Sequence, residues 1–194
     1  MAQKKADKIV TKEEIVRHAM DLAAQLGWGH VTLTDIALAA GLSLAELRAE
    51  VADKFDILAQ LGRLLDQAAL DGAGQGDIDA SPRDRLFDVL MERFEALNDY
   101  RDGIVSVLQS FRCDPKQAVI SCPHVCRSMA WMLEAAGEDT NGIKGAVKVA
   151  GLTGVYLKVL RVWAADDSSD LGKTMAALDK ELARAEKLAG MVGF

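Results

Sequence analysis

Apolar residues recur at helical spacing along almost the whole chain. Ile15, Ala19, Leu22 and Leu26 follow one another every three or four residues and predict one face of a helix over residues 11–26. Similar stripes continue to the end of the sequence. No segment alternates apolar and polar residues over the length of a strand, so we predict an all-α fold.

Short polar motifs predict where the first helices begin. Thr11 with Glu14, and Ser43 with Glu46, have the spacing of a capping box, and Thr34 is the predicted N-cap of a short helix between them. Stripes, caps and glycine stops together predict helices over about 11–26, 34–40, 44–51, 53–70, 82–98, 101–112, 116–136, 142–165 and 170–191.

The composition changes sharply between the fourth and fifth of these helices. Residues 71–81 (DGAGQGDIDAS) hold three glycines and three acidic residues and predict a linker. We therefore divide the chain into a flexible basic tail at 1–10, a small helical domain at 11–70 and a larger helical domain at 82–194.

The two short helices on either side of Gly41 predict a tight helical corner. Gly41 supplies the backbone freedom for the turn, and Leu42 and Leu47 supply the core that both helices share. In DNA-binding proteins with this corner, the second helix lies in the major groove.

The residues around the corner resemble the signature of the TetR family of transcriptional regulators. The resemblance implies a helix-turn-helix domain, a C-terminal domain for ligand binding and dimerisation, and release from DNA when a small apolar effector binds. It rests on Thr32-Leu33-Thr34-Asp35-Ile36-Ala37, Ala40-Gly41-Leu42-Ser43, Leu47, Asp53-Lys54 and Leu58. Carried over to this sequence, it assigns the DNA contacts to Thr34, Ser43, Leu44, Arg48 and Lys54.

The charge of this region departs from that of a usual DNA-binding domain. The whole chain has a net charge of −6, and residues 1–65 hold eight basic against nine acidic residues. Glu46 and Glu50 lie on the predicted recognition helix itself, where they would face phosphate. Because affinity for DNA depends on phosphate neutralisation, we expect DNA binding to be weak.

A second, partial resemblance covers residues 104–185. This segment is similar to the lipid-binding accessory protein of ubiquinone biosynthesis, which shares the TetR fold but binds isoprenoid lipids instead of DNA. The alternative function is therefore that of a lipid or isoprenoid carrier. The similarity rests on Trp131 to Gly137, Lys148, Tyr156, Trp163, Asp166 to Asp170, Thr174 and Leu178-Asp179.

Two sets of apolar residues in the second domain are candidates for binding. Methionines and aromatic residues suit an adaptable apolar cavity, and we place a cavity between residues 82–136 and 142–165. Its predicted lining is Met91, Phe94, Leu108, Phe111, Met129, Met132 and Trp163. A stripe of small residues in the helix at 142–165 predicts close packing with another helix, either of the same chain or of a second subunit, and the family resemblance favours the second subunit. The predicted seam of the homodimer is Val155, Val159, Val162, Met175, Leu178 and Leu182.

The remaining motifs predict neither an enzyme nor a cofactor. The histidines form no constellation with a nucleophile, and Cys122, His124 and Cys126 do not share one helical face, so no metal site is predicted. Three cysteines suggest reduced thiols, and no apolar run reaches the length of a membrane span. We therefore expect a cytoplasmic protein without an integral membrane segment.

Overall fold

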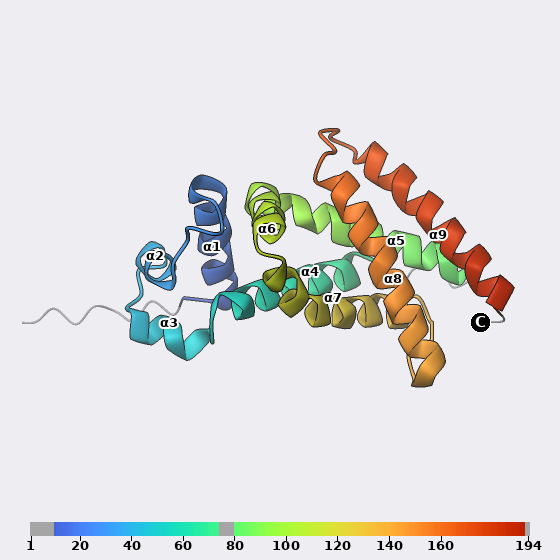
Figure 1. The fold of residues 1–194 in the computed structure, drawn as a ribbon, viewed down its shortest axis with the longest axis horizontal. Helices are drawn as coiled ribbons and strands as arrows, with labels where there is room; N and C mark the ends of the chain where they lie inside the picture. Colours follow the sequence, from blue (N-terminus) through green and yellow to red (C-terminus); the bar gives the residue numbers. More distant parts are fainter. Residues whose placement is uncertain (1–9, 74–79, 193–194) are drawn as a thin grey trace, which may run out of the picture.

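The computed structural model describes residues 10–73 and 80–192, and this part of the chain is entirely helical (Figure 1). The part of the chain predicted as the first domain holds α1 (Lys12–Leu26), α2 (Leu33–Ala39) and α3 (Leu44–Glu50), followed by α4 (Lys54–Ala73). The second domain holds α5 (Pro82–Leu97), the 3₁₀ turn η1 (Asn98–Tyr100), α6 (Arg101–Cys113), α7 (Pro115–Ala135), α8 (Gly142–Trp163) and α9 (Gly172–Val192). The predicted all-α class is confirmed.

The helix starts agree closely with the capping motifs. The capping boxes at Thr11 and Ser43 are both formed, and Ser81 caps α5. The second helix begins earlier than predicted, because Thr32 and not Thr34 is its N-cap, in a third capping box with Asp35. Each cap satisfies backbone N–H groups that a helix start leaves without partners.

One predicted boundary needs correction. Helix α4 continues to Ala73, so it enters the segment that was predicted to be a linker. The helix predicted over 116–136 forms as α7, and it runs without interruption through Pro123. The basic tail and the rest of the linker, residues 1–9 and 74–79, lie outside the described residues.

Helix α4 joins the two domains. In Figure 1 it starts beside α3, at the small domain, and runs into the bundle formed by the later helices. Within that bundle α4 packs against α5 and α7, while α8 and α9 pack against each other. Helix α4 is therefore in contact with both parts of the chain.

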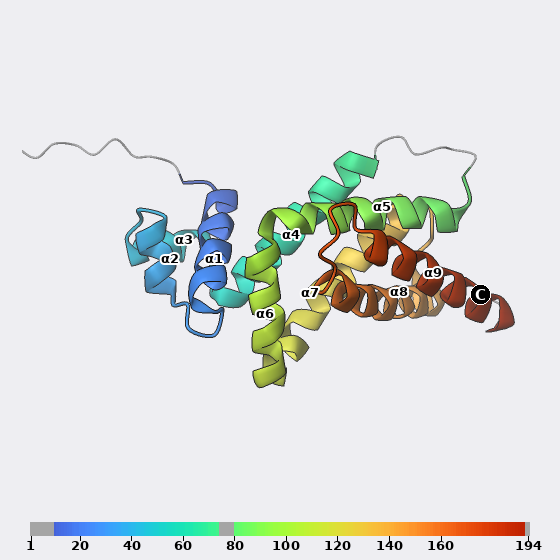
Figure 2. The same cartoon turned by 90° about the horizontal axis from the view of Figure 1, so that it is seen from above.

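A second connection between the domains is the contact of α1 with α6, which lie side by side in both views (Figures 1 and 2). Gly103 of α6 allows this approach, since a Cβ atom there would lie 2.6 Å from the carbonyl oxygen of Met20. Close by, the backbone N–H of Trp28 donates a hydrogen bond to Oγ of Ser106 at 2.8 Å. The small domain is thus held by α6 as well as by α4.

A buried carboxylate fixes the start of the last helix. Oδ2 of Asp166 accepts hydrogen bonds from the backbone N–H and the hydroxyl of Thr174, both at 2.8 Å. Burial raises the pKa of Asp166, but these bonds and those from Ser168 outweigh it and hold the pKa far below its usual value. Asp166 therefore stays ionised and caps α9 from the preceding loop.

Candidate DNA-binding surface and effector cavity

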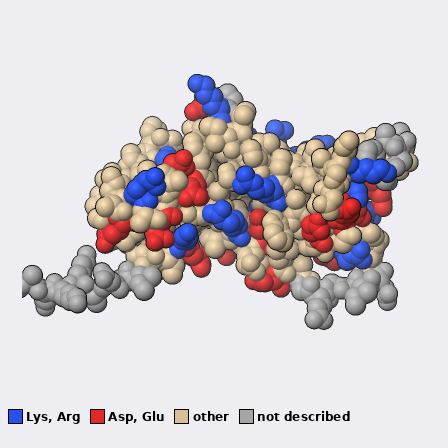
Figure 3. Space-filling view, turned by 90° about the horizontal axis from the view of Figure 1, so that it is seen from below, with Lys and Arg blue, Asp and Glu red and all other residues tan. Residues whose placement is uncertain are grey.

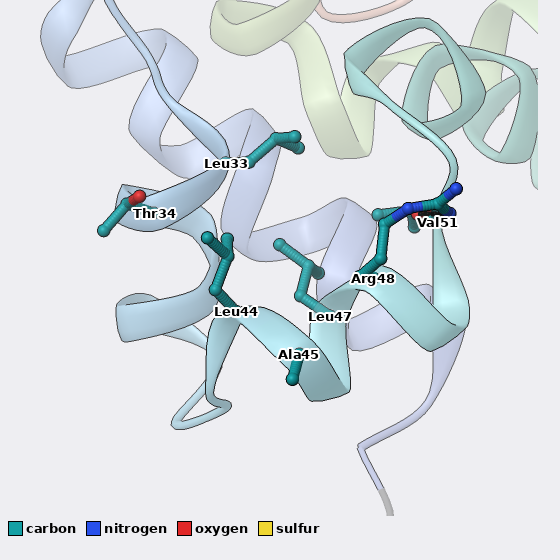
Figure 4. A pocket seen from close by; sticks show the side chains of 7 residues that line it. All are labelled: Leu33, Thr34, Leu44, Ala45, Leu47, Arg48 and Val51. Atoms are coloured by element: carbon teal, nitrogen blue, oxygen red, sulfur yellow. Dashed lines mark hydrogen bonds between the residues drawn. The ribbon is translucent and has the colours of Figure 1, made fainter.

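The predicted recognition helix α3 presents an exposed surface together with the first turn of α2. Thr34, Ser43, Leu44 and Arg48 are all exposed. A hollow of about 390 Å³ lies between the two helices, and it brings together three of these predicted DNA contacts, Thr34, Leu44 and Arg48. Figure 4 shows the side chains that line it: Leu33, Thr34, Leu44, Ala45, Leu47, Arg48 and Val51. The hydroxyl of Ser43 caps α3 by accepting the N–H of Glu46.

The charged side chains of α3 differ in the hydrogen bonds that they make at the ends of the helix. Glu46 accepts the N–H of Ser43 at 2.6 Å, so its charge faces the positive end of its own helix. Nη1 of Arg48 donates to the carbonyl of Val51 at 3.3 Å, at the other end (Figure 4). The side chain of Glu50 is exposed. Glu50, more than Glu46, is therefore the carboxylate that would face phosphate if α3 lay in the major groove of DNA.

Lys54 has a structural role that the sequence did not reveal. Its ammonium donates to the carbonyls of Trp28 and Val31, both at 2.6 Å, and lies 4.3 Å from the centre of the Trp28 ring. Desolvation by burial lowers the pKa of Lys54. Because two of its three donors hold the loop before α2, its predicted contact with phosphate has to use the remaining one.

Nearby contacts fix the end of α3 to α4. Nε2 of Gln60, a buried residue of α4, donates to the carbonyl of Glu50 at 3.2 Å. The orientation of the recognition helix therefore follows the position of α4.

The surface charge of the small domain is mixed. Figure 3 views the molecule from the side on which α3 lies, and Lys/Arg and Asp/Glu side chains are interspersed over this end of it. No continuous basic face is visible there. This view agrees with the nearly equal numbers of basic and acidic residues in residues 1–65.

The second domain contains a cavity of about 270 Å³ between helices α4, α5, α6 and α7. Helix α4 supplies Phe55, Leu58, Ala59, Gly62, Arg63 and Asp66; α5 supplies Arg93; α6 supplies Val107 and Phe111; α7 supplies Ser121, His124, Val125, Arg127, Ser128 and Trp131. The cavity was predicted against the helix at 142–165; this cavity instead has α4, the helix that follows α3, as one wall.

Of the seven residues predicted to line the cavity, only Phe111 does so. The ring of Phe94 stacks on Tyr156 at 5.2 Å, and Nε1 of Trp163 donates to Asn98 at 3.1 Å. Leu108 is half-buried against the core. The others, Met91, Met129 and Met132, are buried in the core with Phe94 and Trp163. These side chains fill the bundle and do not shape the cavity.

A buried ion pair lies at the wall of the cavity, and the sequence analysis missed it. Nη2 of Arg93 lies 3.1 Å from Oδ1 of Asp66, and Nη1 donates to the hydroxyl of Tyr156 at 3.0 Å. Oγ of Ser128 donates to Oδ2 of Asp66 at 2.7 Å. Burial raises the pKa of Tyr156, which therefore stays a neutral partner. In the sequence, the only sign of this ion pair is that Arg93, a charged residue, occupies an inward position of the predicted helix 82–98.

The predicted dimer seam is divided by the structure. Val159, Leu178 and Leu182 are buried in the chain's own core, so they cannot present their side chains to a second subunit. Val155 and Val162 are half-buried, and Met175 is exposed. The exposed apolar residues of α8 that were not predicted are Ile143, Val147 and Leu157.

The cysteines form no metal centre with neighbouring residues. Among the described residues, no group of three or more His, Cys, Asp or Glu side chains is placed to hold a metal ion. Partial desolvation and the neighbouring Cys126 raise the pKa of the exposed Cys122 thiol, while His124 lines the cavity. In the same part of the chain, no helix combines the length and apolar character that a membrane span requires.

Comparisons with known proteins bear on this architecture. No family model and no curated protein matches the sequence. Among solved structures, a TetR regulator from Nitrosomonas europaea superposes with a TM-score of 0.72 at 25% identity, over 91% of this chain and 98% of its own. A TetR regulator from Rhodococcus sp. RHA1 gives 0.66 at 17% identity, over 88% and 92%.

A third neighbour is the TetR-family repressor FadR of Thermus thermophilus, solved in complex with lauroyl-CoA. It gives a TM-score of 0.54 at 21% identity, over 92% of both chains. These neighbours do not support the resemblance to the ubiquinone accessory protein. The fold implied by the resemblance of residues 11–58 is confirmed: this chain has the fold of the TetR-family transcriptional regulators.

Proposed function

We propose that this protein is a homodimeric regulator that binds DNA weakly through residues 32–54 and releases it when a small effector enters the cavity of the second domain. The observation that carries the proposal is the course of α4. This helix supplies six residues of the cavity lining, and its first turns are bonded to α3 and to the loop before α2. A ligand that displaces α4 therefore shifts the recognition helix.

The neighbour solved in complex with lauroyl-CoA supports an effector-responsive function of this kind. The lipid-carrier alternative has one supporting observation, the exposed carboxylate of Glu50 on α3. The two functions predict different responses when that charge is changed.

We expect Glu50→Lys to tighten binding to mixed genomic DNA roughly fivefold at low salt, because it removes a charge that repels phosphate, worth on the order of 1 kcal/mol per site. Arg48→Ala should weaken binding. Fluorescence anisotropy titrations of the wild type and both variants at several salt concentrations measure these effects.

Glu95→Lys is the matched control, since it makes the same change of charge at an exposed position of α5, in the other domain. It should change the affinity far less than Glu50→Lys. If Glu50→Lys and Arg48→Ala both leave binding unchanged, α3 does not face DNA and the carrier function becomes the better explanation.

The homodimer is proposed to form through α8 and α9. Ile143, Val147 and Leu157 leave an apolar strip exposed along α8, and small residues between them, Ala150 and Gly154, permit close approach of a second helix.

Light scattering of the purified protein at micromolar concentration should accordingly give twice the chain mass of 20.9 kDa. Leu157→Asp should shift the mass toward one chain, while Leu38→Asp, which changes an exposed leucine of α2, should leave the dimer intact. A monomer mass for the wild type would contradict the proposed dimer.

A further inference from the structure

We propose that the cavity between α4 and α7 is selective for a small organic anion, a compact apolar body that carries one acidic group. This inference rests on the proposed function, in which the same cavity binds the effector. It adds the chemical class of the ligand, which neither the fold nor the comparisons assign.

The first observation is the charge of the lining. Arg63, Arg93 and Arg127 line the cavity, and Asp66 is the only acidic residue that does so. His124 adds a group that can donate a hydrogen bond. An excess of positive charge in the lining attracts an anion, whereas it would not stabilise a purely apolar ligand.

The second observation is that the cavity has polar atoms without partners. Arg93 is only 4% exposed, and its Nε has no hydrogen-bond partner among the described residues, although its other nitrogens are bonded. The buried Oγ of Ser121 lacks a partner in the same way. One acceptor of the lining, Oδ1 of Asp66, also has no hydrogen bond, and its charge is balanced by Nη2 of Arg93 at 3.1 Å. Buried donors are normally satisfied, so two of them at one cavity indicate an acceptor supplied by a ligand.

The third observation distinguishes the arginines nearer solvent. Arg63 lies 3.7 Å from Asp56, so its charge is partly compensated. Arg127 is exposed and has no ion-pair partner in the part of the chain that the structure describes. Arg127 therefore remains available to attract an incoming acid. Inside the cavity, Arg93 and Ser121 offer the acid hydrogen-bond donors.

The rest of the lining defines the body of the ligand. Apolar side chains from α4, α6 and α7 surround the space, namely Phe55, Leu58, Val107, Phe111, Val125 and Trp131. A volume of about 270 Å³ corresponds to roughly nine water molecules at about 30 Å³ each. A cavity of this volume suits an aromatic acid or a medium-chain fatty acid of about ten non-hydrogen atoms.

Direct binding to the full-length protein, in the absence of DNA, tests the proposal. The probes are octanoate and 4-ethylbenzoate, each compared with its neutral amide by isothermal titration calorimetry at pH 7.5. We expect at least one acid to bind about tenfold more tightly than its own amide. The difference in affinity between the two acids shows whether the cavity prefers an aromatic or an aliphatic ligand.

Arg127→Gln should reduce the preference for the acid severalfold and leave the affinity for the amide unchanged. Arg112→Gln is the matched control, because Arg112 is an exposed arginine of α6 that does not line the cavity. Equal affinities for acid and amide, no binding of either, or equal effects of the two variants would overturn the proposal.

The outcome is separable from that of the proposed function. Selective binding of the acid by a protein that binds no DNA would leave this inference standing and refute the regulator. DNA binding without any preference for the acids would refute this inference alone.

Discussion

Replacing Arg93 by methionine is expected to lower the free energy of unfolding by about 3 kcal/mol. The side chain of Arg93 is 4% exposed and that of its partner Asp66 13%, and the two lie 3.1 Å apart. Removing the arginine leaves a poorly solvated carboxylate, and it also deprives Tyr156 and Ser128 of a donor. Urea unfolding at one fixed protein concentration measures the effect.

A double variant separates the loss of the pair from a general disturbance of the core. Arg93→Met with Asp66→Leu removes both charges and should recover most of the lost stability, because apolar residues of similar size can replace a buried ion pair. Arg17→Met breaks an exposed pair with Glu13 and should cost less than about 1 kcal/mol. A double variant no more stable than the single one would contradict this account.

Gly103→Ala is expected to destabilise the protein by about 2 kcal/mol, although alanine favours helices. Its Cβ would lie 2.6 Å from the carbonyl oxygen and 2.9 Å from Cα of Met20. These are backbone atoms of α1, so the two helices have to separate, and the bond from Trp28 to Ser106 should weaken with them. Urea unfolding measures the stability, and hydrogen exchange at the Trp28 amide measures the loosening.

Gly190→Ala is the matched control, because Gly190 also lies near the end of a helix, α9. Open space surrounds the position that its Cβ atom would take. This variant should be as stable as the wild type or slightly more stable. If Gly103→Ala behaves in the same way, the α1–α6 contact does not hold the domains together as described.

The sequence predicted the helices well because their signals are local. A capping box involves residues three positions apart, so Thr11 and Ser43 identified helix starts without any knowledge of the fold. The misplaced cap at Thr34 shows the limit, since Thr32 with Asp35 offered an equivalent motif two residues earlier. Local motifs fix the presence of a helix more firmly than its first residue.

The effector cavity could not be predicted in the same way, because it depends on contacts between distant segments. Phe94 and Trp163 are large and apolar, but whether such residues line a cavity or fill the core depends on packing partners such as Tyr156 and Asn98. The pairing of Arg93 with Asp66 joins α5 and α4 and leaves no periodic pattern in the sequence. Similarly, the bonds that engage Lys54 come from a loop more than twenty residues away.

The central claim, that this chain is a DNA-binding regulator, is tested most directly by selecting genomic DNA. Sheared fragments of the source genome are incubated with the purified wild-type protein at moderate salt, and the bound fragments are sequenced. Arg48→Ala serves as the comparison. Our account predicts enrichment of a small set of fragments that share a two-fold symmetric site, and its loss in Arg48→Ala. Recovery of no enriched fragment, or of the same fragments with Arg48→Ala, would contradict it.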